Sequence, residues 1–259
     1  MNWFEAVILG LLQGLTEFLP VSSSGHLEIA KSLFSVDPDA TFYFTVAVHG
    51  ATVLSTIVVF RKEIISLTGG LLKFRMNDET SYILKLIVSM IPVGLTGLLL
   101  KEPVEKLFTG NIVFVGLMLL ITAVFLTTAH FIRKRDRGIG YTDALVIGIA
   151  QALAVIPGIS RSGATISAGL IIGNKKEEVP RFSFLMVLVP VIGANLLEIF
   201  SSDAVKGPGN MFVILVGCIT AFFSGYAACR WMINLVKRSK LIWFAIYCAA
   251  AGLLSVILG

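Results

Sequence analysis

Two stretches of the chain decide its fold: Phe18-Leu-Pro-Val-Ser-Ser-Ser-Gly25 and Ile156-Pro-Gly-Ile-Ser-Arg-Ser-Gly163. Each interrupts an apolar helical run, because proline removes a backbone donor and glycine weakens a helix. The runs that follow, about 26–35 and 164–173, are too short to cross a bilayer, which takes roughly 20 residues. We therefore expect two re-entrant helical hairpins, at 2–35 and 141–174.

The rest of the chain is unusually apolar. Of its 259 residues, 56% are hydrophobic and 14% are charged, against about 25% charged in soluble domains. Six further runs are apolar enough for transmembrane helices, and they lie near 42–60, 81–100, 111–132, 183–200, 211–233 and 241–258. The sequence thus predicts an all-α integral membrane protein with six transmembrane helices and two re-entrant helical hairpins. No cleavable signal peptide is expected, because Glu5, Gln13 and Glu17 interrupt the first apolar run.

The two hairpins resemble each other without gaps at an offset of 138 residues. The matched residues are Gln13 with Gln151, and Ser22-x-Ser24-Gly25 with Ser160-x-Ser162-Gly163. Each hairpin precedes three spans, so the chain reads as a single membrane domain of two repeats, about 1–132 and 141–259. Because three is odd, the second repeat enters from the opposite side, which is an inverted-topology repeat with its site near the midplane. Chance similarity between short apolar stretches is the alternative.

Loop charges give the orientation. One alternating set of loops carries 14 Lys and Arg, and the other carries 4. The first set comprises 61–80, 133–142, 173–182 and 233–240, and the second comprises 31–41, 101–110 and 201–210. Because basic loops stay in the cytoplasm, the first hairpin and both termini are expected to open to the outside. The net charge of +5 follows this pattern and does not indicate nucleic-acid binding.

Charged side chains accompany both breaks. Glu17 precedes the first break, four residues after Gln13 on the same helix face, and a carboxylate there needs a partner, a proton or a metal. Arg161 lies at the second break and meets Glu17 if the hairpin tips meet; a structural buried ion pair is the alternative. His26 follows the first serines by one glycine and can act as nucleophile or general acid–base.

Both breaks lead into helix N-termini, whose unpaired N–H groups bind anions. Two such ends, lined by hydroxyls and joined by Arg161, suit a phosphate or diphosphate, although serines before helices are more often simple N-caps. The candidate binding residues are Ser22, Ser23, Ser24, Gly25, Ser160, Ser162, Gly163 and Thr165. His49 and His130 lack such surroundings and are interpreted as structural.

The runs 13–26 and 157–165 are similar to the two signature motifs of a known family. The chain resembles the bacterial undecaprenyl-diphosphatase family, also called the bacitracin-resistance protein family, over essentially its whole length. The resemblance implies hydrolysis of undecaprenyl diphosphate to the monophosphate at a site open to the outer face of the bacterial cytoplasmic (inner) membrane. This reaction recycles the carrier lipid for cell-wall synthesis and gives bacitracin resistance.

The resemblance also implies a divalent metal, Mg²⁺ or Ca²⁺. The family's first motif begins with glutamate or glutamine, here Gln13, so metal binding is expected to rest mainly on Glu17 with help from Gln13. The expected catalytic residues are Glu17, Ser23, His26 and Arg161. Ser23, His26 or a water activated by His26 is the attacking group, with a slight preference for histidine-assisted chemistry.

The expected partners are a polyprenyl diphosphate lipid and the bilayer, and a homodimer is compatible with the sequence. Two rival interpretations stay open. A transporter or flippase for a phosphorylated lipid would use the same anion site between broken helices. A structural membrane scaffold is disfavoured, because buried charges in a membrane protein are costly and mark functional sites.

Overall fold

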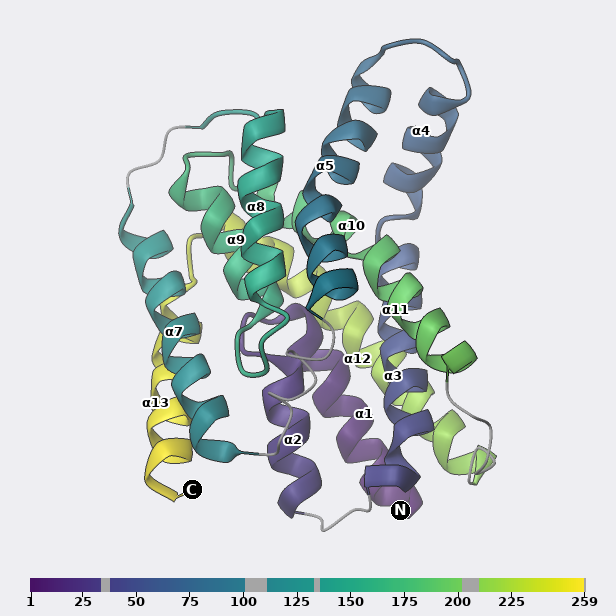
Figure 1. Cartoon of the computed structure of the whole chain (residues 1–259), viewed down its shortest axis with the longest axis vertical. Helices are drawn as coiled ribbons and strands as arrows, with labels where there is room; N and C mark the ends of the chain where they lie inside the picture. Colours follow the sequence, from purple (N-terminus) through teal and green to yellow (C-terminus); the bar gives the residue numbers. More distant parts are fainter. Residues whose placement is uncertain (34–37, 101–110, 133–135, 202–209, 259) are drawn as a thin grey trace.

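The computed structural model describes residues 1–33, 38–100, 111–132, 136–201 and 210–258, and these form twelve α-helices and no β-strand (Figure 1). The helices are α1 (Trp3–Phe18), α2 (Ser23–Leu33), α3 (Pro38–Val59), α4 (Arg61–Leu71), α5 (Asp78–Leu99), α7 (Ile112–Phe131), α8 (Tyr141–Leu153), α9 (Arg161–Ile171), α10 (Val179–Met186), α11 (Leu188–Ser201), α12 (Met211–Lys237) and α13 (Ile242–Leu258). The predicted all-α architecture is confirmed.

The two sequence motifs lie at the tips of two helix pairs that enter the molecule from opposite ends. The first pair is α1–α2, with the N-terminus at its open end, and the second pair is α8–α9 (Figure 1). The two tips meet in the middle of the molecule, where the Ser162 hydroxyl donates to the Leu19 carbonyl at 3.1 Å. The expectation that the two breaks come together is therefore confirmed.

Backbone geometry explains both breaks. In the first pair Leu19 is extended and Pro20 carries no N–H, so α1 ends. The chain turns at Ser22, whose φ of 69° lies in the left-handed region that serine rarely adopts. In the second pair the residue with positive φ is Gly158, at 95°. A Cβ there would lie 2.6 Å from the Val115 carbonyl oxygen, so this turn requires glycine.

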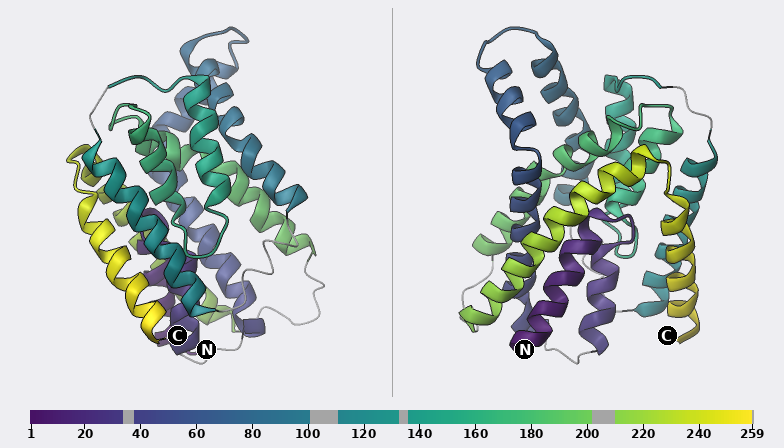
Figure 2. Two further views of the ribbon diagram at one scale, coloured as in Figure 1. Left: turned by 60° about the vertical axis from the view of Figure 1, so that its left-hand side comes forward. Right: turned by 180° about the vertical axis from the view of Figure 1, so that it is seen from behind.

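Long neighbouring helices hold the two pairs in place. α12, with 27 residues, packs against α1 and α3, and α13 packs against α7 (Figure 2). The α7–α13 contact is close, because a Cβ on Gly116 would lie 2.8 Å from the Gly252 carbonyl oxygen. Contacts between small residues of this kind are typical of helix packing in membranes.

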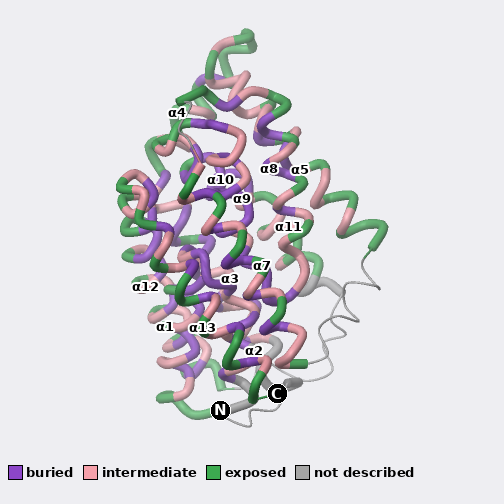
Figure 3. Tube along the Cα trace, turned by 90° about the vertical axis from the view of Figure 1, so that its left-hand side faces the viewer, coloured by how far each residue is buried: buried purple, intermediate pink, exposed green. Residues whose placement is uncertain are grey.

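Within the described ranges, four helical segments are long and apolar enough to cross a membrane. They are α5 (Asp78–Leu99), α7 (Ile112–Phe131), the consecutive α10 and α11 taken together (Val179–Leu197) and α12 (Met211–Lys237). The bent pair Tyr43–Val59 and Arg61–Leu71 adds a fifth if it counts as one span. The outer faces of the helices expose large apolar side chains, such as Leu98 at 82% and Phe131 at 75% (Figure 3). The chain is therefore a multi-pass α-helical membrane protein.

Three predicted spans differ in detail from the structure. The span 42–60 ends in a bend of 73°, and α4 then occupies much of the predicted loop 61–80. Phe60 lies at this bend with its side chain buried against the Phe184 ring, 6.2 Å away between centroids, so core packing turns the chain. The span 183–200 is divided at Val187 into α10 and α11, and the last span, α13, has 17 residues.

The loops used to orient the chain are only partly described. The loop 101–110 lies outside the described residues, as do parts of 31–41, 133–142 and 201–210.

Candidate active site

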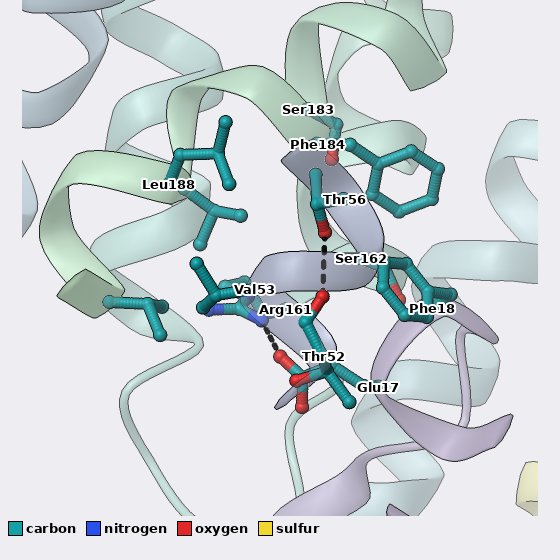
Figure 4. A pocket seen from close by; sticks show the side chains of 12 residues that line it. Glu17, Phe18, Thr52, Val53, Thr56, Arg161, Ser162, Ser183, Phe184 and Leu188 are labelled. Carbon is teal, nitrogen blue, oxygen red and sulfur yellow. Dashed lines mark hydrogen bonds and ion pairs between the residues drawn. The ribbon is translucent and has the colours of Figure 1, made fainter. Parts of the chain in front are cut away.

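An ion pair between Glu17 and Arg161 joins the two tips. Glu17 lies in the last turn of α1, and Arg161 opens α9. The guanidinium Nη2 donates to the Glu17 carboxylate (Figure 4). The Glu17 side chain is 8% exposed, and the Arg161 side chain is 28% exposed. A carboxylate this deeply buried is stabilised by a cation and by hydrogen bonds, so the meeting of these residues, 144 positions apart in sequence, is a defining feature of the site.

Three further side chains surround the Glu17 carboxylate. The Gln13 amide donates to Oε2 at 3.0 Å, and the Ser23 hydroxyl donates to the same oxygen at 2.7 Å. The His49 Nε2 atom lies 4.0 Å from Oε2. Because the carboxylate and the Ser23 hydroxyl are already in hydrogen-bond contact, Glu17 is placed to accept a proton from Ser23.

The two tips repeat one capping arrangement. In the second pair the Ser160 hydroxyl accepts from the Gly163 N–H at 3.1 Å and lies 3.3 Å from the Ser162 hydroxyl. In the first pair the Ser22 hydroxyl accepts from the Gly25 N–H at 3.3 Å and lies 3.4 Å from the Ser24 hydroxyl. These serines are N-caps, as the plain alternative expected, and the caps direct both helix N-termini toward one region.

A cavity of about 330 Å³ lies at these N-termini. The predicted residues that line it are Glu17, Ser22, Ser23, Ser24, Ser160, Arg161 and Ser162. A smaller hollow of about 20 Å³ lies beside the same ion pair, next to Phe18 and Leu188 (Figure 4). The larger cavity therefore joins hydroxyls, one guanidinium and one carboxylate, which is a donor set suited to a phosphorylated group.

His26 faces away from this group of residues. Its Nδ1 lies 2.8 Å from the Ser22 carbonyl oxygen, and its Nε2 lies 2.6 Å from the Tyr247 hydroxyl of α13. Its ring also stacks on the Tyr247 ring at 5.6 Å. His26 is not among the residues that line the 330 Å³ cavity. In this structure it supports the first tip loop from behind, and its expected catalytic role stays a prediction.

Four other predicted residues also lie outside the cavity lining. Gln13 acts through its bond to Glu17, and Gly25 and Gly163 contribute backbone N–H groups to the two caps. Thr165 is fully buried, and its hydroxyl lies 2.6 Å from that of Ser183. The structure thus connects Thr165 to α10, with no contact to the cavity.

The cavity contains polar residues that the sequence did not single out as site residues. They are Thr16 on α1, Thr45 and His49 on α3, Gln151 on α8 and Asn195 on α11. His49, interpreted above as structural, lies beside Glu17, and its Nδ1 is 2.9 Å from the Thr45 carbonyl oxygen. Its local sequence carried no signal of this position, because the approach to Glu17 depends on how α3 packs against α1.

The oxygen atoms around Glu17 are compatible with a divalent cation. No group of three or more His, Cys, Asp or Glu gathers within the described ranges. The Gln13 Oε1 atom is buried and has no hydrogen-bond partner among the described residues, although it belongs to the side chain that holds Glu17. Mg²⁺ commonly uses one or two protein oxygens together with substrate phosphates and waters, so Glu17 and Gln13 fit such an ion.

The fold and this site define a class: a multi-pass helical membrane protein with a cavity between two broken helix pairs, lined by serines, Glu17 and Arg161. Comparison with known proteins narrows the class. The chain belongs to the family described as bacitracin resistance protein BacA, whose family model matches residues 6–254.

Named relatives cover nearly the whole chain. It is 49% identical to the undecaprenyl-diphosphatase of Parabacteroides distasonis over 260 residues, which is 99% of this chain and 98% of that protein. It is 48% identical to the undecaprenyl-diphosphatase of Bacteroides fragilis, with the same coverage. It is 38% identical to undecaprenyl-diphosphatase 2 of Bacillus thuringiensis, over 97% of this chain and 96% of that protein. The resemblance seen in the two motifs is confirmed.

Proposed function

We propose that this chain hydrolyses undecaprenyl diphosphate to undecaprenyl phosphate and inorganic phosphate, which recycles the carrier lipid for cell-wall synthesis and gives bacitracin resistance. The observation that carries the proposal is the buried Glu17–Arg161 pair beside a cavity lined by serines of both tips. The names of the close relatives support the same reaction.

In the membrane, the chain has six transmembrane helices and two re-entrant hairpins in an inverted-topology repeat. The opposite directions of the two helix pairs support this arrangement, and the loop charges support an active site facing the outside of the bacterial inner membrane. The prenyl tail lies between helices, while the diphosphate reaches the cavity. Both halves of the site belong to one chain. The site therefore does not need a homodimer, and a homodimer is compatible with it.

The diphosphate is held by charge and by hydrogen-bond donors. Arg161 presents a planar fork of N–H groups that matches phosphate oxygens, and the N-termini of α2 and α9 add a positive dipole. The hydroxyls of Ser24 and Ser160 complete the set of donors, whereas the Ser162 hydroxyl already donates to the Leu19 carbonyl.

Ser23 is the nucleophile best placed by the geometry, because its hydroxyl already donates to Glu17 at 2.7 Å. Its oxygen attacks the terminal phosphorus, its proton passes to Glu17, and the bond to the departing undecaprenyl phosphate breaks. Glu17 passes this proton to the departing undecaprenyl phosphate and so becomes a carboxylate again. Water then attacks the phosphoserine, with Glu17 as the base for that water. The bond between phosphorus and the Ser23 oxygen breaks, the proton returns from Glu17 to that oxygen, and inorganic phosphate leaves. This scheme replaces the preference for histidine-assisted attack, because His26 faces Tyr247.

The expected Mg²⁺ or Ca²⁺ ion belongs to the same proposal. Glu17 and Gln13 would hold it, and when bound it would neutralise diphosphate oxygens and stabilise the leaving phosphate. One carboxylate with one amide makes a weak site by itself, so the diphosphate is expected to supply further ligands.

The test is release of inorganic phosphate from undecaprenyl diphosphate by purified protein in detergent, with and without a chelator. We expect release by the wild type, its loss with chelator, and its recovery on adding Mg²⁺ or Ca²⁺. Glu17→Ala should release almost none. Detergent offers no second compartment, so a protein that binds the lipid but never releases phosphate would favour the flippase and overturn the proposal.

A further inference from the structure

Gln151 is a buried amide whose side chain has no hydrogen-bond partner in the described part of the chain. It lies on α8, is 2% exposed, and lines the 330 Å³ cavity. Neither its Nε2 nor its Oε1 atom hydrogen-bonds to any of the described residues. Leaving a buried amide unpaired costs free energy, so a side chain of this kind beside a cavity points to a group that binds there.

Gln13, the residue of the first pair that corresponds to Gln151, has a hydrogen-bond acceptor that Gln151 lacks within the described residues. Gln13 lies 138 positions earlier, and its Nε2 donates to Glu17 at 3.0 Å. The residue four positions after Gln151 is Val155, which also lines the cavity and cannot accept a hydrogen bond. The repeat has thus kept the amide while removing its acceptor, and both N–H groups of Gln151 are left free.

The surroundings of Gln151 favour an anionic oxygen as its partner. Ser160 and Arg161 line the same cavity, and both belong to the N-terminus of α9. A prenyl tail would leave the amide unpaired, whereas a phosphate oxygen accepts an N–H from it.

We propose that Gln151 is a substrate-binding residue, whose amide N–H donates to an oxygen of the diphosphate in this cavity. This inference rests on the proposed function. It assigns to the second helix pair a contact beyond Arg161 and its serine caps, and it gives the second glutamine of the repeat a role distinct from that of the first.

The test substitutes Gln151→Leu, which keeps the approximate volume and removes the amide. Phosphate release from undecaprenyl diphosphate gives kcat and KM in detergent, and inhibition by a prenyl methylenediphosphonate reports binding without hydrolysis. Because a lost hydrogen bond to a charged group weakens binding about tenfold or more, we expect KM and the inhibition constant to rise by that factor. Tm should stay the same or rise, because an unpaired buried amide has been removed.

Ser167→Ala is the matched control. The Ser167 hydroxyl is also buried and unpaired within the described part of the chain, yet Ser167 does not line this cavity. Its removal should leave KM and the inhibition constant unchanged. Gln151→Met provides the same readouts if Gln151→Leu does not fold.

The outcomes are distinct. An active wild type and a folded Gln151→Leu protein with unchanged KM and inhibition constant would refute the binding role and leave the proposed function intact. A lowered Tm with unchanged affinity would show a structural role instead, and would equally overturn the inference. A wild type that releases no phosphate would overturn the proposed function itself.

Discussion

The two helix pairs share their capping chemistry and differ in the residues that perform chemistry. Both tips place a serine hydroxyl on the N–H group three residues later, at 3.3 Å in the first pair and 3.1 Å in the second. Three of the matched positions that differ carry reactive or charged groups: Glu17 and Val155, Ser23 and Arg161, and His26 and Ala164. One half thus supplies the carboxylate, the hydroxyl that we propose as nucleophile and the imidazole, and the other supplies the guanidinium. Neither half is sufficient alone.

The largest expected effect on activity comes from replacing Glu17 of the first pair by valine, the residue at the matched position 155 of the second pair. Glu17→Val removes both the base and the partner of Arg161, so phosphate release should fall about 1,000-fold or more. The guanidinium, which is 28% exposed and lines the cavity, loses its partner, so stability should fall by less than the cost typical of a fully buried pair, which is about 3–5 kcal/mol. Phosphate release and the midpoint of chemical unfolding measure the two effects.

A double variant sharpens this result. Glu17→Val with Arg161→Leu removes both charges, so stability should recover while activity stays lost. Equal instability of the single and double variants would contradict the ion pair as the source of the loss.

Arg161→Lys keeps the positive charge of the second pair and removes the planar guanidinium with its paired N–H groups. Lysine binds phosphate as a point charge, without paired N–H groups. We expect a loss of about 100-fold in kcat/KM with little change in Tm, measured by phosphate release over a range of substrate concentrations. Near-normal turnover would show that only the charge matters.

His26→Ala gives the first pair the residue that the second carries at the matched position. Because His26 bonds to the Ser22 carbonyl and to Tyr247, we expect it to act by positioning the tip loop, with a loss in kcat of about tenfold to 100-fold. Tyr247→Phe breaks only the outer bond and should cost about threefold to tenfold. Complete loss in His26→Ala with normal turnover in Tyr247→Phe would instead indicate direct catalysis by the imidazole.

The smallest effect is expected at the shared caps. Ser22→Ala and Ser160→Ala each remove one capping hydroxyl, which should lower stability by about 1 kcal/mol in either pair. Ser22→Gly should lose less, because glycine accepts the φ of 69° found there. Thermal unfolding of the three variants checks this order, and a much larger loss at one cap would show that the two tips are not equivalent.

The sequence was sufficient to predict the parts of the site that depend on the backbone. Proline and glycine mark both breaks, and the 138-residue offset pairs them, so the contact between Glu17 and Arg161 followed. Most of the serines expected to line an anion site do line the cavity. The breaks and their serines depend on short stretches of sequence, and the repeat shows that the two stretches correspond to each other.

Side-chain directions could not be predicted in the same way. Whether His26 faces the cavity or α13 depends on a helix more than 200 residues away. His49 approaches Glu17 because α3 packs beside the first pair, and nothing in its local sequence fixes that packing. The bend at Phe60 likewise results from contact with a distant residue, Phe184.

The Glu17–Arg161 pair also limits how the two halves of the molecule move. It spans the seam between them, so any rocking of one repeat against the other, as alternating access in transporters requires, would have to separate two buried charges in every cycle. Glu17 is the more costly of the two to leave unpaired, because its side chain is 8% exposed, against 28% for Arg161. The seam is therefore better suited to hold a headgroup still for chemistry than to pass it from one face of the bilayer to the other.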